Sequence, residues 1–250
     1  QVLIAGCTVK RFAGNGISIR GGREDCILGC DIHTMGRGGT SVSGGDRATL
    51  TQAKHVVENC RMYSLGLIDQ TYVPGVGLNG VGCRVAHNLF YDLPSSAVRF
   101  DGNDHLIEYN QVHHVVLVSG DQGGMETFGA TFRGTVLRYN HFSNIGFGQS
   151  GGHAGIRLDD AISGMLVYSN IFYRCGDTED DKSGDQRKGA THINSGRDNI
   201  IDNNIFADCP QPVTGGYNRR NNQWDALAGG KKTDFLFTKL YMDRYPDLKG

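Results

Sequence analysis

The chain has 250 residues, enough for one large hydrophobic core, and its 25 basic and 26 acidic side chains give a net charge of -1. So balanced a charge predicts no binding to nucleic acid or to an anionic membrane surface, and no apolar run approaches the roughly 18–20 residues that span a bilayer. The 37 glycines and only 5 prolines indicate many tight turns between short strands.

A four-residue element recurs eight times along the chain. Its second residue is Cys in the first three copies and Asn in the last five: Cys7, Cys30, Cys60, Asn88, Asn110, Asn140, Asn170 and Asn204. Neighbouring copies lie 22 to 34 positions apart, which fits one coil of a parallel β-helix with turns of variable length. We expect these side chains to form a ladder inside successive turns, with the cysteines as buried free thiols. The odd cysteine count excludes complete disulfide pairing, and the lack of a Cys-x-x-Cys pair argues against a zinc site.

Two further apolar-alternating stretches accompany each copy of this element. One follows it, at 16–19, 40–43, 75–79, 97–101, 125–128, 156–159 and 191–194, and the other precedes it, as at 105–109 and 135–139. Three short strands per coil predict an all-β protein, a right-handed parallel β-helix of the pectate-lyase-like kind with about seven to eight coils. We expect this domain to span residues 1–214, and an irregular segment at 215–250 to pack on the β-helix or cap it.

Strand alternation predicts a charged face on one sheet of the β-helix. In the stretch 156–159 the apolar residues point inward, so Arg157 and Asp159 point outward. The same rule places two parallel rows of side chains on successive coils: Arg99, Glu126, Arg157 and His192 in one, and Asp101, Asp159 and Asn194 in the other. A lattice of surface ion pairs is one interpretation of these rows.

Glycan chemistry is the other interpretation. One carboxyl group must stay protonated to release the leaving oxygen, while an ionised one acts as nucleophile or activates water. Register places Glu126 and Asp159 on adjacent coils with Cα atoms on the order of 8 Å apart, a spacing that leaves both retaining and inverting mechanisms open. His153, in a glycine-rich loop, and His192 are each either a substrate contact or a plain surface residue. Trp224, the only tryptophan, either stacks on a sugar or pins the tail.

Several segments together resemble the β-helix proteins of glycoside hydrolase family 141. They lie at 29–32, 43–47, 71–78, 84–88, 102–110, 119–121, 155–160 and 196–200, and cover most of the chain. The resemblance implies a secreted or periplasmic hydrolase of plant-cell-wall-type glycans, since the family includes α-L-fucosidases and xylanases. It also implies an acidic catalytic pair formed by Asp121 of a Ser-Gly-Asp loop and by Asp159 or Asp160 of a Leu-Asp-Asp element.

The family usually extends beyond both ends of this chain, which begins at Gln1 without an initiator Met or a signal-peptide pattern. We therefore expect the chain to be truncated relative to a longer protein. For the hydrolase we expect a polysaccharide or oligosaccharide substrate and neither a metal nor another cofactor.

Two other functions stay open on sequence grounds. A polysaccharide lyase would use the same scaffold with a calcium-bound uronate and an Arg or Lys base, and Arg99 beside Asp101 or Arg157 beside Asp159 permits this chemistry. A non-catalytic glycan-binding β-helix is the third possibility. Product analysis distinguishes the first two, because a lyase leaves an unsaturated sugar that absorbs ultraviolet light.

Overall fold

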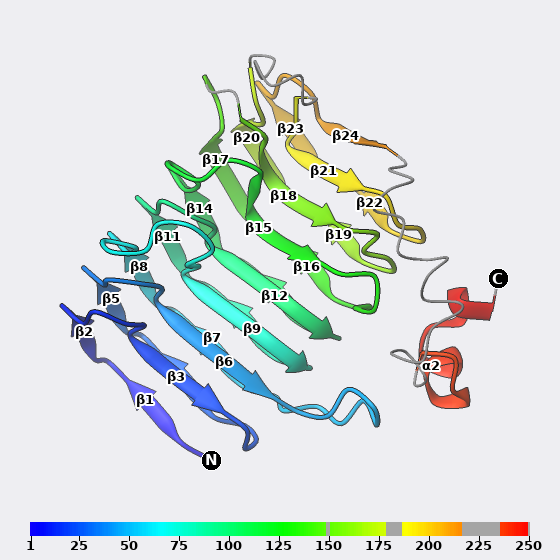
Figure 1. Ribbon diagram of the computed structural model, residues 1–250, viewed down its shortest axis with the longest axis horizontal. Coiled ribbons are helices and arrows are strands. Elements are labelled where there is room, and N and C mark those ends of the chain that lie inside the picture. Colours follow the sequence, from blue (N-terminus) through cyan, green and yellow to red (C-terminus); the bar gives the residue numbers. More distant parts are fainter. Residues whose placement is uncertain (149–150, 179–186, 217–235, 250) are drawn as a thin grey trace.

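The computed structural model describes residues 1–148, 151–178, 187–216 and 236–249. Three parallel sheets of eight strands each wind around one core, and successive strands of a sheet come from successive coils (Figure 1). The predicted right-handed parallel β-helix with three strands per coil is therefore confirmed, with eight coils. None of the described helices is long and apolar enough to cross a membrane.

The three sheets are named here A, B and C. Sheet A contains β1 (Leu3–Ala5), β4 (Cys26–Leu28), β7 (Val56–Glu58), β10 (Arg84–Ala86), β13 (Leu106–Glu108), β16 (Val136–Arg138), β19 (Leu166–Tyr168) and β22 (Ile200–Asp202). Sheet B contains β2 (Thr8–Lys10), β5 (Asp31–His33), β8 (Arg61–Tyr63), β11 (Leu89–Tyr91), β14 (Gln111–His113), β17 (His141–Ile145), β20 (Ile171–Cys175) and β23 (Ile205–Ala207). Sheet C contains β3 (Ile17–Arg20), β6 (Thr40–Gly44), β9 (Val76–Val81), β12 (Val98–Asn103), β15 (Gln122–Phe128), β18 (His153–Asp159), β21 (Thr191–Asn194) and β24 (Val213–Gly216).

The core is a set of apolar stacks, one from each sheet. In the three-residue strands of sheet A the central residue points inward, and from β4 to β19 these residues are fully buried: Ile27, Val57, Val85, Ile107, Leu137 and Val167. In sheet B, Phe142 and Phe172 stack with ring centroids 4.8 Å apart. Burying one such side chain stabilises the fold by roughly 1.5–3 kcal/mol. The periodic apolar positions therefore stabilise the winding of the chain into coils around one core.

The Cys/Asn ladder lies in the turn between sheets A and B. Each rung binds the next coil: the backbone N–H of Cys30 contacts Cys60 Sγ at 3.4 Å, and that of Cys60 donates to Asn88 Oδ1 at 2.8 Å. The residue before each rung has a positive φ, as at Tyr139 (φ 55°), which turns the chain tightly enough to point the next side chain inward. All seven cysteines are free thiols. Cys30 and Cys60 are buried as predicted, whereas Cys7 is exposed because it lies in the first coil, which no preceding coil covers.

The described part of the C-terminal segment packs against the side of the β-helix. The helix α2 (Lys239–Arg244), capped by Thr238, and the 3-10 helix η2 (Pro246–Lys249) lie beside the ends of the middle strands of sheet C, not across an open end of the stack (Figure 1). The Asn103 amide donates to the Tyr245 hydroxyl at 3.1 Å. Strand β24 ends at Gly216, two residues past the expected boundary. Trp224 lies outside the described residues.

Candidate functional site

A row of charged side chains crosses the longest strands of the β-helix, β15 and β18 of sheet C. Register pairs Arg99 with Glu126, Glu126 with Arg157, and Arg157 with His192, which is the order that strand alternation predicts. Successive members come from neighbouring coils about 4.8 Å apart. Inward-facing residues on the same strands, among them Met125, Ile156 and Leu158, are fully buried, and this packing holds the charged residues on the outer face.

The second outward row is only partly as expected. The Asn194 amide donates to Asp159 Oδ1 at 2.6 Å, so these two members do meet. The strand partner of Asp159 on the preceding coil, however, is Phe128. Asp101 lies one coil further toward the N-terminus, where its partner on the coil before is Asn79. An aromatic ring therefore separates the Asp101 position from the Asp159 position. Asp101 is half-buried, and this burial raises the pKa of its carboxyl group.

A cavity of about 260 Å³ opens over this part of sheet C. Its lining combines carboxyl groups, guanidinium groups and aromatic rings: Tyr72, Arg99, Glu126, Thr127, Phe128, Arg157, Asp159 and Asp160. Two of the three predicted catalytic residues, Asp159 and Asp160, line the cavity, whereas Asp121 does not.

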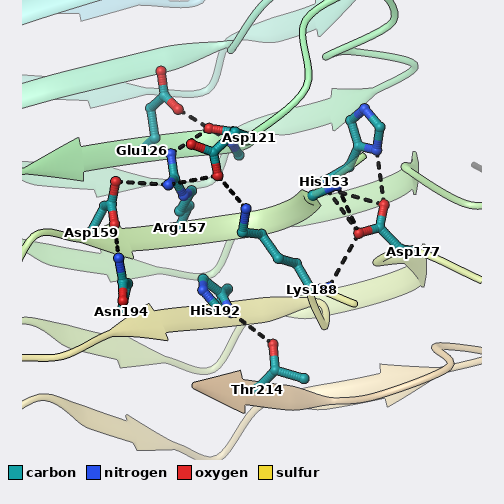
Figure 2. Close-up of polar contacts among 12 residues, drawn as sticks. Asp121, Glu126, His153, Arg157, Asp159, Asp177, Lys188, His192, Asn194 and Thr214 are labelled. Atoms are coloured by element: carbon teal, nitrogen blue, oxygen red, sulfur yellow. Dashed lines mark hydrogen bonds and ion pairs between the residues drawn. The ribbon is translucent and has the colours of Figure 1, made fainter. Parts of the chain in front are cut away.

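Arg157 joins the two acidic elements that the family resemblance singles out. Its Nη2 lies 2.8 Å from Asp121 Oδ1 and 2.7 Å from Asp159 Oδ2, so these two carboxylate oxygens lie at most 5.5 Å apart (Figure 2). Lys188 Nζ also binds Asp121. Partial burial works against ionisation of Asp121, but the contacts with Lys188 and Arg157 outweigh it and hold the pKa of this carboxyl group below its usual value. Asp121 is therefore an ionised anchor for two cations.

Glu126 has the opposite electrostatic character. Its side chain is buried, with 4% of the residue exposed. It accepts hydrogen bonds from the backbone N–H of Gly123 at 3.2 Å and from Ser96 Oγ at 3.3 Å. Loss of hydration raises the pKa of Glu126 in spite of these donors and of the positive charges of Arg99 and Arg157. The carboxyl group thus stays protonated to higher pH than an exposed glutamic acid.

Asp160 occupies the end of the strand that carries Asp159. Its backbone has a positive φ of 49°, which ends β18 and leaves the side chain at the cavity rim. Desolvation and then the neighbouring charge of Asp159 raise the pKa of Asp160. The cavity therefore holds two carboxyl groups with raised pKa, Glu126 and Asp160, together with a carboxylate, Asp159, that is ion-paired to Arg157.

His153 braces the wall of the site and does not line the cavity. It is 5% exposed, and its Nδ1 lies 2.8 Å from Oδ1 of buried Asp177. The Asp177 carboxylate also accepts backbone N–H bonds of 3.1 Å from Gly152, His153 and Lys188. One buried carboxylate thus ties the glycine loop before β18 to the segment that carries Lys188 (Figure 2).

His192 lies at the far end of the charged row from Arg99. Its Nδ1 is 3.0 Å from Thr214 Oγ1 of β24, and the residue is 9% exposed. Burial, and then the charges of Lys188 and Arg157, lower the pKa of His192 to about 4. The imidazole is consequently neutral in the folded protein at neutral pH.

No protein-family model matches the chain, and neither does any curated protein sequence. The A-module of the mannuronan C-5 epimerase AlgE4 from Azotobacter vinelandii aligns at a TM-score of 0.54 and 11% identity, over 86% of this chain and 57% of that module. The common feature is the fold. A glycoside hydrolase aligns at 0.49 and 13% identity, over 89% of this chain and 39% of its own, and the AlgE6 A-module at 0.47 and 12%, over 87% and 56%. The chain thus spans between 39% and 57% of the length of these structures.

Four residues of the site escaped sequence reasoning. Asp177 and Lys188 lie on either side of an acidic stretch of sequence, yet Asp177 is 2% exposed and Lys188 7%. Tyr72 and Phe128 join the cavity as rings contacting Arg99. A sequence signal existed only for Phe128, because alternation along 125–128 places it on the same face as Glu126.

The lyase interpretation includes a calcium ion that is bound together with a uronate of the substrate. Within residues 1–148, 151–178, 187–216 and 236–249, no three His, Cys, Asp or Glu side chains converge so as to hold a metal ion. The carboxylates of Asp121 and Asp159 are both held by the guanidinium group of Arg157.

Proposed function

We propose that the protein is a carbohydrate-active enzyme that hydrolyses glycosidic bonds of a polysaccharide or oligosaccharide bound across sheet C. The observation that carries the proposal is one cavity that holds both a buried carboxyl group of raised pKa, Glu126, and a carboxylate ion-paired with arginine, Asp159. Glycoside hydrolysis requires such a pair, one group as acid and the other as nucleophile or base.

Each carboxyl group then has a definite task. Glu126 transfers its proton to the glycosidic oxygen as the bond from that oxygen to the anomeric carbon breaks. The Asp159 carboxylate attacks the anomeric carbon or takes a proton from the water that does so. Register places the two residues on adjacent strands with Cα atoms on the order of 8 Å apart, which spans a sugar between them.

Asp121 receives a supporting task in this proposal. The resemblance to glycoside hydrolase family 141 assigns it to the catalytic pair, and its carboxylate oxygen lies within 5.5 Å of one of Asp159. A group that is bound to both Lys188 and Arg157 and has a lowered pKa is, however, a poor proton donor. We therefore assign Asp121 to orienting Arg157, which in turn orients Asp159.

The proposal is tested with a panel of xylan, pectin and alginate in water enriched in ¹⁸O. Hydrolysis incorporates one labelled oxygen into each new reducing end, which mass spectrometry detects. Replacing Glu126 with glutamine keeps the shape and removes the acid, and should lower turnover about 10²–10⁴-fold. Ser18→Ala on exposed β3 of the same sheet is the matched control. Full activity in Glu126→Gln alongside an inactive Asp121→Asn would move the acid role to Asp121.

A second candidate, a lyase or epimerase acting on a uronate, is favoured by one observation. Arg99 lines the cavity, and no described carboxylate oxygen lies within 4.0 Å of it, so it is available to neutralise a substrate carboxylate. The AlgE4 module, which shares the fold, is described as a mannuronan epimerase. A lyase would yield an ultraviolet-absorbing unsaturated sugar without ¹⁸O, and an epimerase would leave the chain length unchanged.

We also propose that the protein acts outside the cytoplasm, in a secreted or periplasmic location. A polymer bound across several coils of sheet C is too large to enter a cell intact. Fractionation of the source cells, with detection by antibody, tests this location, and recovery of the protein only from the cytoplasm would refute it.

A further inference from the structure

Arg99 differs from the other cations of the site in its partners. Its guanidinium carbon lies 4.8 Å from the centroid of the Tyr72 ring and 4.4 Å from that of Phe128. Among the residues that the structure describes, no carboxylate lies within ion-pairing distance of it. Aromatic contacts of this kind hold a guanidinium group in place without neutralising its charge.

Arg99 has no ion pair among the described residues, although its charge acts on the carboxyl group of Asp101, two residues along β12. The positive charge of Arg157 is shared by Asp121 and Asp159, and that of Lys188 by Asp121. Glu126, the strand neighbour of Arg99, has no ion pair among the described residues, and burial raises the pKa of its carboxyl group. Arg99 is therefore the cation of the cavity lining that has no ion pair among the described residues, and its guanidinium group can accept an anion as a partner.

We propose that Arg99 forms a subsite for an oxyanion carried by the substrate, the carboxylate of a uronic acid or the sulfate ester of a sulfated sugar, in the sugar ring next to the bond that is cleaved. This inference rests on the proposed function in taking the ligand to be a glycan. The guanidinium group is planar and presents paired N–H donors that match both oxyanions.

The aromatic residues complete the subsite. Tyr72 is 53% exposed and Phe128 40%, so each ring offers apolar surface to a bound ligand while it contacts Arg99. Sugar rings present C–H groups that pack on such surfaces. Since Arg99 lies on β12, on the N-terminal side of Glu126, the anionic sugar should lie on that side of the proton donor, and the Asp159 coil should face the other side.

The test compares each acidic glycan with its neutral counterpart. Oligogalacturonate and oligomannuronate are each compared with their methyl esters, and a sulfated fucan oligosaccharide is compared with its desulfated form. Calorimetry measures the affinity of the protein for each glycan. The wild-type protein should bind one acidic form about tenfold more tightly than its neutral partner, the gain expected of one charge-assisted contact. The pair that shows the difference tells carboxylate from sulfate.

Variants tie this preference to Arg99. Arg99→Gln should reduce the preference to less than about twofold, and Arg99→Lys, which keeps the charge without the planar fork, should give an intermediate value. Arg20→Gln, on exposed β3 of the same sheet, is the matched control and should keep the full preference. A preference that survives both Arg99 substitutions, or the absence of any preference in the wild-type protein, would overturn the subsite.

The same measurements separate this inference from the proposed function. If acidic glycans bind through Arg99 and none is cleaved, the hydrolase proposal fails and the anion subsite stands. If acidic and neutral forms are cleaved with equal efficiency, the subsite fails and hydrolysis stands.

Discussion

Replacing Asn140 with alanine should destabilise the β-helix, because it breaks hydrogen bonds between successive rungs of the Cys/Asn ladder. Asn140 is 1% exposed. Its Oδ1 accepts from the backbone N–H and the side-chain amide of Asn110 at 3.0 and 2.9 Å. Its Nδ2 donates to Ile107 O at 2.9 Å and to Asn170 Oδ1 at 3.0 Å. The side chain thus connects three coils.

The magnitude follows from these four hydrogen bonds. Each contributes roughly 0.5–1.5 kcal/mol, and no water reaches the buried partners to replace them, so the loss should be about 4 kcal/mol in the free energy of unfolding. Asn204 is the matched control, because its side chain also makes four hydrogen bonds but is half-exposed. Water can replace its lost contacts, so Asn204→Ala should cost only about 1 kcal/mol.

Urea unfolding followed by circular dichroism measures both variants, and hydrogen exchange locates the loosened coils. In Asn140→Ala the backbone amide of Asn110, which loses its acceptor, should show the largest increase in exchange rate over the wild type. A cost for Asn140→Ala below about 1 kcal/mol, or equal costs for the two variants, would show that the ladder is not stabilised by its buried amide network.

Three further outcomes are expected. Because the pKa of Glu126 is raised in the fold, its contribution to stability is complete below its unfolded pKa and is lost as pH rises through the folded pKa. The melting temperature of Glu126→Gln should therefore rise relative to that of the wild type as pH increases from 4 to 8. A difference in melting temperature that does not depend on pH would contradict this. The pKa of His192 is lowered to about 4, so its protonation between about pH 6.5 and 4 favours the unfolded state. In acid, the free energy of unfolding of His192→Gln should therefore exceed that of the wild type by up to about 3 kcal/mol. Identical acid transitions in the two proteins would exclude the effect. Asp177→Ala removes the hydrogen bonds that connect the loop at 151–153 with Lys188. Hydrogen exchange at 151–153 should increase, and kcat/KM should fall about tenfold. Unchanged exchange at 151–153 would show that these hydrogen bonds are dispensable.

The periodicity of the sequence predicts the β-helix and the order of side chains along its charged face. The repeated Cys or Asn positions, flanked by short apolar strands, leave one architecture that buries every apolar stripe, and each strand has a strict period of two. This period predicts one row of outward side chains, and the pairing register shows that row: Arg99, Glu126, Arg157 and His192.

Which of those side chains form ion pairs, and how their pKa values shift, depends on long-range packing and not on the repeat. The loops between sheets B and C differ in length from coil to coil, so no period places Tyr72 against Arg99 or brings Lys188 onto Asp121. Burial is likewise a property of the assembled coils: it raises the pKa of Glu126, while cations lower that of Asp121. Local periodicity sets which face a residue occupies, but long-range packing sets its hydration and its partners, and these determine its chemistry.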